Sequence, residues 1–250
     1  MDADLFAYLL RIADDRLVLG HRLSEWCGHG PILEEDIALA NISLDLVGQA
    51  NHLLQLAGSV EGAGRDQDRL AYFREAVEYR NALICELPRG DFAFTIVRQL
   101  VVAARDMLLF DRLAHSARSD LSGIAAKALK EVRYHARHSA DWIVKLGDGT
   151  EESHRRAQRA LDDLWRYTGE LFDTDGVERR LVERGIGVDS STLAAEWRAQ
   201  VAEVVERATL KLPADGYMMR GGRVGRHTEH LGHMLAEMQI VARSFPGAKW

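Results

Sequence analysis

The sequence predicts an all-α protein in which four long helices form a bundle and further helices follow toward the C-terminus. Apolar residues recur at spacings of three and four along several long segments, which is the pattern of amphipathic helices. The chain contains only 4 Pro in 250 residues, and it is 47% hydrophobic and 28% charged, as expected of a soluble helical protein. We find no long linker and no internal repeat, so the sequence predicts a single domain over residues 1–250.

The first predicted helix covers residues 5–26, and the second covers residues 33–56. The apolar stripe of the first consists of Leu5, Leu9, Ile12, Leu19, Leu23 and Trp26. Gly28 and the following Gly-Pro pair end it. The second helix is apolar over more than half of its circumference, as expected of a helix in the middle of a bundle, and should end near Gly58.

Residues 70–83 are aromatic and charged and predict another helix, which a turn at residues 88–91 follows. Asp91 is a suitable N-cap for a third long helix over residues 92–117. The inner stripe of that helix is Ile96, Leu100, Ala103, Met107, Phe110 and Ala114. A fourth long helix over residues 122–146 stops at a Gly-Asp-Gly sequence.

The last hundred residues are helical but less regular. The pattern predicts helices over residues 151–172, 177–184 and 190–210, the last of them behind a Ser-Ser-Thr cap. A loop rich in Gly and Arg, residues 215–226, precedes a final helix over residues 228–245. These segments form the additional C-terminal helices.

Composition also excludes several classes of partner. The net charge of -6 argues against a nucleic-acid-binding surface, which needs a clustered positive field. No apolar stretch approaches the ~20 residues that cross a bilayer. Cys27 and Cys85 form neither a CxxC pair nor a disulfide framework, and no apolar leader opens the chain. We therefore expect a cytoplasmic protein that binds neither nucleic acid nor membranes.

A bundle of this type commonly holds two metal ions at its centre. The ligands are one Glu or Asp from each of two helices and a Glu-x-x-His pair from each of the other two. Neither the second nor the fourth long helix contains such a pair. Leu46 and Gln49 stand at that spacing on the second helix, and Val132 stands three residues before His135 on the fourth.

The other two helices are no better suited to a metal ion. Arg16 lies at the centre of the apolar face of the first helix, with Asp15 at its edge, and Asp106 lies on the inner stripe of the third. Leu and Val cannot bind a metal, Gln is a poor neutral ligand, and a guanidinium group repels a dication. The sequence therefore predicts a ferritin-like helical bundle whose metal site is degenerate, with no metal or cofactor bound by this chain.

Three separated segments resemble the structural subunit of the bacterial phenylacetyl-CoA epoxidases, a family of ring-oxygenating multicomponent monooxygenases. The segments are EWCGHGPILEEDIALANISLDLVGQA, KEVRYH and HTEHLGHMLAEMQ, and the resemblance extends over essentially the whole chain. The catalytic relative has a DEVGHG-like sequence where this chain has Leu46 in place of Glu and Gln49 in place of His. It has an EESFH-like sequence where this chain has Val132 in place of Glu and keeps His135.

The resemblance implies that the chain is not an enzyme by itself. It would be one subunit of a complex of phenylacetate catabolism that epoxidises the ring of phenylacetyl-CoA with O2 and electrons from a reductase. The implied partners are a homologous catalytic subunit that contains the di-iron centre, a small bridging subunit and the reductase. This chain would pair with the catalytic subunit and stabilise it. An alternative to this role is a scaffold without an enzyme partner, in which the isolated chain forms a homodimer.

A catalytic alternative rests on polar residues that share one stripe of the fourth long helix. These residues are Glu131, His135, His138 and Trp142. With Asp106, the stripe would form a mononuclear metal site, and the chain would then be a self-sufficient metal-dependent oxidase or oxygenase. We favour the interpretation that Asp106 and Glu131 neutralise Arg16, because buried charges persist only when they are paired.

Two polar groups are better explained by surface or interface positions than by metal binding. The C-terminal group is His227, Glu229, His230, His233 and Glu237. Three of its members, His230, His233 and Glu237, lie beside the apolar stripe of the final helix, so we expect an exposed face or a subunit interface. The second group, Asn41, Asp45, Gly48 and His52, lies opposite the inner stripe of its helix and predicts a solvated or interhelical polar edge.

Three arginines of the Gly-rich loop are candidates for binding an anion. Arg220, Arg223 and Arg226 would contact a phosphate, for instance that of a CoA ester, or acidic residues of a partner. Guanidinium groups bind both kinds of group through paired hydrogen bonds.

Overall fold

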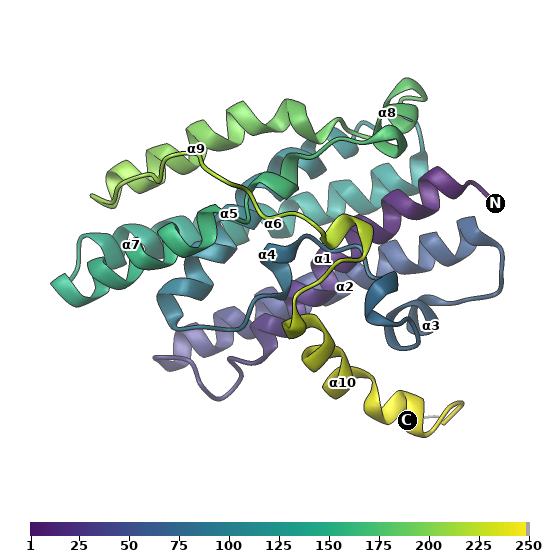
Figure 1. Cartoon of the computed structure of the whole chain (residues 1–250), viewed down its shortest axis with the longest axis horizontal. Helices are drawn as coiled ribbons and strands as arrows, with labels where there is room; N and C mark the ends of the chain where they lie inside the picture. The colour runs from purple at the N-terminus through teal and green to yellow at the C-terminus, as the bar shows by residue number, and fades with distance from the viewer. Residues whose placement is uncertain (249–250) are drawn as a thin grey trace.

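Four long helices form the centre of the computed structural model, which describes residues 1–248. They are α1 (Ala3–Ser24), α2 (Leu33–Glu61), α5 (Phe92–Leu113) and α6 (Ser119–Gly147). α1 packs along α2, α5 packs along α6, and α2 also contacts α6 (Figure 1). Every regular element of the described residues is a helix, which confirms the predicted all-α bundle.

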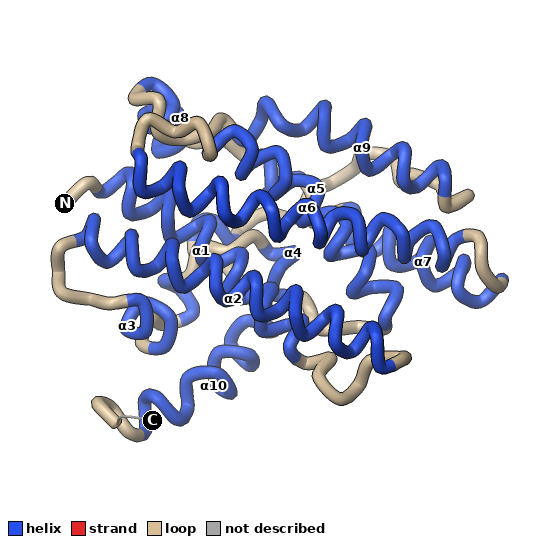
Figure 2. The backbone as a smooth tube through the Cα atoms, turned by 180° about the vertical axis from the view of Figure 1, so that it is seen from behind, coloured by secondary structure: helices blue, strands red, loops and turns tan. Residues whose placement is uncertain are grey.

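Shorter helices surround these four. Three short helices lie between α2 and α5: α3 (Gln67–Tyr72), the 3-10 helix η1 (Ala76–Glu78) and α4 (Leu83–Glu86). The helices that follow α6 are α7 (Glu151–Trp165), η2 (Gly169–Phe172), α8 (Gly176–Glu183), η3 (Ser190–Leu193), α9 (Ala194–Arg207), η4 (Gly222–Val224) and α10 (Glu229–Ser244). α7 and α9 pack on α5 and α6, and α8 packs on α1. α10 contacts α3 and η1 and projects from the bundle in both views (Figures 1 and 2).

Local sequence explains where several of these helices begin and end. The Asp91 carboxylate accepts the amide of Phe94 at 2.9 Å and caps α5, as predicted. α2 does not end near Gly58 but continues to Glu61, where Gly62 adopts a φ of 70°. Gly58 instead allows a close approach, because a Cβ atom there would lie 2.1 Å from the carbonyl oxygen of Arg65.

The predicted helix over residues 70–83 is wrong, because this segment is broken into α3, η1 and α4. Its backbone amides have partners outside the segment. The amide of Arg80 donates to Asp14 at 2.8 Å, and the amide of Ala82 donates to Asp15 at 2.7 Å. Two carboxylates of α1 thus replace the carbonyl acceptors that a continuous helix would supply.

Three further helices end earlier than the sequence predicts. α5 stops at Leu113 because the amide of Ala117 donates to the carbonyl of Gly185 at 2.8 Å. α7 stops at Trp165, after which the carbonyl of Arg166 accepts the amide of Met219 at 2.7 Å. The predicted helix over 190–210 is η3 followed by α9, which ends at Arg207.

The predicted inner stripe of the first helix is buried. Leu5, Leu9, Ile12, Leu19, Leu23 and Trp26 all belong to the hydrophobic core. Within residues 1–248, none of the helices combines the length and the apolarity that crossing a bilayer requires.

Candidate functional site

The space between the four long helices contains a cluster of buried charges. We call Asp15, Arg16, Arg105, Asp106 and Arg223 the buried ion cluster. Its members come from α1, from α5 and from the loop that precedes α10, and they join segments far apart in the sequence. Its two carboxylates, Asp15 and Asp106, are the candidate ligands of α1 and α5, and guanidinium groups bind both of them.

Arg16 is 1% exposed and points into the bundle. Its guanidinium group forms an ion pair with Asp106 and lies 3.8 Å from Asp15. The same group lies 5.2 Å from the centre of the Phe110 ring. The predicted pairing of Arg16 with Asp106 is therefore confirmed, and the pair compensates a charge that could not otherwise remain buried.

Asp15 is the most heavily bonded carboxylate of the cluster. It accepts hydrogen bonds from Arg223 Nη1 and Nη2 at 2.9 and 2.8 Å, and Arg105 Nη1 lies 3.7 Å away. Burial alone would raise the pKa of Asp15, but the charges of Arg223, Arg105 and Arg16 outweigh it and lower the pKa below its ordinary value. Asp15 is thus held as a buried carboxylate.

The buried ion cluster does not fit a metal ion. Arg105 Nη1 also donates to Asp106 at 2.9 Å, so three guanidinium groups face two carboxylates. A dication there would meet an excess of positive charge, and both carboxylates already accept from arginines. Among residues 1–248, no group of three or more His, Cys, Asp or Glu side chains is gathered as a metal site requires.

The polar residues of α6 pair with α2 one by one. His135 Nε2 lies 3.0 Å from Asp45, and His138 Nε2 lies 2.8 Å from Glu35. Gln49 donates to Glu131 at 2.9 Å, so the predicted contact of Glu131 with Arg16 is wrong. The hydrogen-bond partner of the Glu131 carboxylate is thus Gln49 of α2, at the interface between α2 and α6.

The apolar replacements lie in the core between these polar pairs. Leu46 and Val132 are each 1% exposed. Trp142, the last member of the predicted stripe, packs edge-on against Phe92 with ring centres 5.1 Å apart. The structure therefore does not bring Asp106, Glu131, His135 and His138 to one point, because each has a different partner.

The polar face of α2 is largely an interhelical edge. Asp45 contacts His135, and His52 Nε2 lies 3.4 Å from Lys127 Nζ of α6. A groove of about 150 Å³ runs beside Gly48 between α2 and α6. Asn41, at the other end of this face, is exposed.

The loop arginines have different roles from one another. Arg223 belongs to the buried ion cluster, so its prediction as a phosphate or partner contact is wrong; besides Asp15, it donates to the carbonyl groups of Arg11 and Arg80. Arg220 is exposed and donates to Asp173 at 2.7 and 2.9 Å. Arg226 is exposed.

The C-terminal polar group is divided between the interior and the surface. His227 is buried against Glu86, whereas Glu229, His233 and Glu237 are exposed and His230 is half-buried. Most of this group therefore lies on an exposed face. Val241 of α10 is also 50% exposed.

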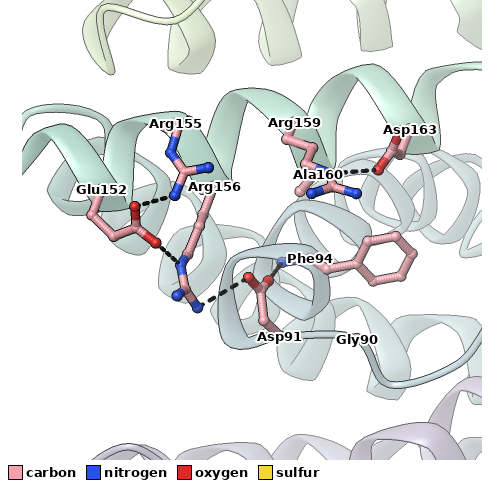
Figure 3. Close-up of a pocket in the computed structure, with 9 residues that line it drawn as sticks. All are labelled: Gly90, Asp91, Phe94, Glu152, Arg155, Arg156, Arg159, Ala160 and Asp163. Atoms are coloured by element: carbon pink, nitrogen blue, oxygen red, sulfur yellow. Dashed lines mark hydrogen bonds and ion pairs between the residues drawn. The ribbon is translucent and has the colours of Figure 1, made fainter.

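A surface pocket lined by arginines lies apart from the buried ion cluster (Figure 3). It has a volume of about 340 Å³ and lies between the start of α5 and α7. Arg155 pairs with Glu152, Arg156 pairs with Glu152 and Asp91, and Arg159 pairs with Asp163. Asp91 is about 22 Å from Asp106 along α5, at 1.5 Å per residue. The acidic and basic side chains of this pocket balance one another and are exposed, so the pocket offers no catalytic group.

Sequence reasoning missed two members of the buried ion cluster. Arg105 adjoins Asp106 in an apolar helix, and this pair of opposite charges was the available signal. Arg223 lies in a loop about two hundred residues from Asp15, and no local pattern predicts that contact. A second buried pair, Arg74 with Asp14 at 2.5 Å, was missed for the same reason.

Comparison with known proteins gives two results. The family model described as phenylacetic acid catabolic protein matches residues 1–250. The chain is also 49% identical over 246 residues to one of the subunits, designated C, of the 1,2-phenylacetyl-CoA epoxidase of Escherichia coli (strain K12). This match covers 98% of the chain and 99% of the relative.

Proposed function

Because the chain belongs to the phenylacetic acid catabolic protein family, we propose that it is the structural subunit of a phenylacetyl-CoA epoxidase. The similarity to the Escherichia coli epoxidase component over nearly the full length of both proteins supports a role as a subunit of that complex. In this role the chain contributes a folded surface to the assembly, and the epoxidation takes place on another subunit. We expect this assembly in the cytoplasm.

The observation that carries the non-catalytic part of the proposal is the buried ion cluster. Arg16 lies between α1 and α5, paired with Asp106, where a catalytic bundle needs carboxylates free to bind metal. Leu46, Gln49 and Val132 likewise cannot replace the ligands expected on α2 and α6. His135 is the one residue of the ligand pattern that remains, and it contacts Asp45.

The proposed partners are a homologous catalytic subunit that holds the di-iron centre, a small bridging subunit and a reductase. A subunit that binds only the folded form of its partner stabilises that form by mass action. For a permanent pair, the interface should bury more than about 2,000 Å² and be substantially apolar. The chain would then maintain the fold and the substrate access of the catalytic subunit.

Iron loading tests the non-catalytic assignment. This chain and its catalytic homologue are separately incubated with ferrous iron without oxygen, desalted, and analysed for iron by mass spectrometry. We expect two iron ions per catalytic homologue and only trace iron in this chain. Two iron ions per molecule of this chain would overturn the proposal and favour a self-sufficient oxygenase.

Co-expression tests the pairing. We expect this chain and the catalytic homologue to elute together in size-exclusion chromatography as one complex. Separate elution, with this chain as a homodimer, would contradict the pairing and favour a scaffold without an enzyme partner.

A further inference from the structure

The C-terminal segment is attached to the bundle through a buried histidine. His227 Nδ1 lies 2.7 Å from Glu86 Oε2, and His227 Nε2 lies 3.1 Å from the carbonyl oxygen of Tyr79. The side chains of His227 and Glu86 are 5% and 0% exposed, respectively. A neutral imidazole carries a proton on only one ring nitrogen, whereas both nitrogens of His227 face an acceptor. Only the imidazolium form donates both hydrogen bonds.

Every contact of the Glu86 carboxylate supports an ion pair with the imidazolium form of His227. Besides His227, its carboxylate accepts from Asn81 Nδ2 at 2.8 Å and from the backbone amide of Thr228 at 2.6 Å. All three neighbours are donors, so the carboxylate acts only as an acceptor, as an ionised group does. Thr228 is the residue directly before α10. Glu86 therefore binds two consecutive residues at the point where α10 begins.

We propose that the His227–Glu86 pair is a pH-sensitive latch that fastens α10 to the bundle. The far part of α10 is held separately by Gln239 and Arg243, which donate to backbone carbonyls of residues 71, 72 and 74, so the latch controls the start of a helix that projects away from the four long helices (Figure 1). The exposed side chains of Ile240, Val241 and Phe245 lie on this helix or directly after it. Opening the latch would change how these apolar groups are presented.

Charged groups of α1 and of the segment between η1 and α4 surround the latch. Arg22 Nη2 of α1 donates to the carbonyls of Glu86 and His230 at 2.9 and 2.8 Å. Arg80 Nη1 donates to the same Tyr79 carbonyl at 2.6 Å. Asp14 of α1 adds a negative charge nearby.

Alkaline pH should open the latch. Burial alone would lower the pKa of His227, but the hydrogen bond and charge of Glu86, the Tyr79 carbonyl and the charge of Asp14 raise it above the ordinary 6.5. A group whose pKa is raised by folding contributes its full stabilisation of the folded form at pH values below its pKa in the unfolded chain. This stabilisation is lost as the pH rises through the folded-state pKa. The attachments of Arg22, Gln239 and Arg243 remain, so the expected opening is confined to the start of α10 and the residues before it.

Hydrogen exchange of the full chain tests this proposal. His227→Gln keeps a polar side chain but is always neutral, and His233→Gln changes an exposed residue of the same helix as the matched control. At pH 6 we expect amides at the start of α10 to exchange about tenfold or more faster in His227→Gln than in the wild type, since glutamine cannot make the charge-assisted hydrogen bond to Glu86. The ratio should fall toward one as the pH rises through the titration of His227. His233→Gln should match the wild type throughout, and α5 amides should report that every variant is folded.

Nuclear magnetic resonance of the wild-type chain keeps the proposal testable if the variant does not fold. We expect both ring nitrogens of His227 to be protonated at pH 6 and its titration to lie above 6.5. Titration at or below the ordinary value would overturn the latch. Equal exchange of α10 in wild type and His227→Gln at pH 6 would also overturn it.

Discussion

At the residue scale, the buried charges of α1 and α5 bind one another. Arg16 and Asp106 neutralise each other, and Asp15 accepts from Arg223. Such groups stabilise a fold only while each has its partner, because an unpaired buried charge costs several kcal/mol. The cluster therefore makes the stability of the fold depend on single charged residues.

Removing one charge of the Arg16–Asp106 pair should be strongly destabilising. Asp106→Asn leaves Arg16 buried without its nearest carboxylate, and we expect the free energy of unfolding to fall by about 3–5 kcal/mol. Urea denaturation measures this change. The matched control is Asp4→Asn, which breaks the surface pair with Arg180 and should cost far less, because solvent screens an exposed pair. Equal losses in the two variants would contradict the role given to burial.

The stability supplied by Asp15 should depend on pH in a defined direction. Its folded-state pKa is lowered from 3.8, so its contribution is complete above that value and is lost as the pH falls through the folded-state pKa. The difference in unfolding free energy between wild type and Asp15→Asn should therefore be large at pH 7 and shrink below about pH 4. Urea denaturation from pH 7 to pH 3 gives this difference. A difference that stays constant over that range would refute the lowered pKa.

At the element scale, contacts between helices decide where several of them end. Asp14 and Asp15 of α1 bind amides of residues 80 and 82 and prevent a continuous helix there. α6 ends at Gly147, where a Cβ atom would lie 2.0 Å from the carbonyl oxygen of Ala208. The end of α6 thus depends on the absence of a side chain at its contact with the segment after α9.

Two glycines of α6 should respond in opposite ways to the same substitution. Gly147→Ala forces a clash with backbone and should destabilise the protein by about 1–3 kcal/mol. Gly123→Ala, where a Cβ atom would meet nothing within 4 Å, should stabilise it by about 0.5–1 kcal/mol, because alanine favours the helix. Thermal unfolding followed by circular dichroism measures both variants. A stabilising Gly147→Ala would contradict the close contact with Ala208.

The long helices could be predicted from the sequence because their signals are local. Apolar spacing along α1 and the N-cap Asp91 of α5 both depend on residues within a few positions of each other. The loss of the ligand pattern at Leu46, Gln49 and Val132 was visible for the same reason. The partner of Arg223 and the breaks between residues 70 and 83 could not be predicted, because their cause lies in Asp14 and Asp15, far away in the sequence.

At the scale of the whole molecule, the C-terminal segments pack on the bundle and contribute to its buried ion cluster. The loop before α10 returns to α1 and inserts Arg223 beside Asp15, and α8 packs on the same helix. The fold of the four long helices is thus completed by residues from the end of the chain. Such a bundle is suited to present a rigid surface to a second subunit.

Binding to the catalytic homologue should stabilise both chains. At a free partner concentration one hundred times the dissociation constant, mass action adds about 2.7 kcal/mol to the free energy of unfolding. Thermal unfolding of each chain alone and of the mixture measures this effect, with an unrelated helical protein as the control. Unchanged unfolding temperatures in the mixture would argue against a stabilising pair.

The most direct test of the central claim is the turnover of a reconstituted complex whose copy of this chain lacks the three candidate ligands of α6. Glu131→Gln, His135→Gln and His138→Gln are introduced together, and assembly is checked by size-exclusion chromatography. If this chain contributes structure and not chemistry, the complex should form and epoxidise phenylacetyl-CoA at the wild-type rate. An assembled complex with full iron in its catalytic subunit but at least about a hundredfold lower turnover, the scale of a lost acid–base group, would contradict the claim.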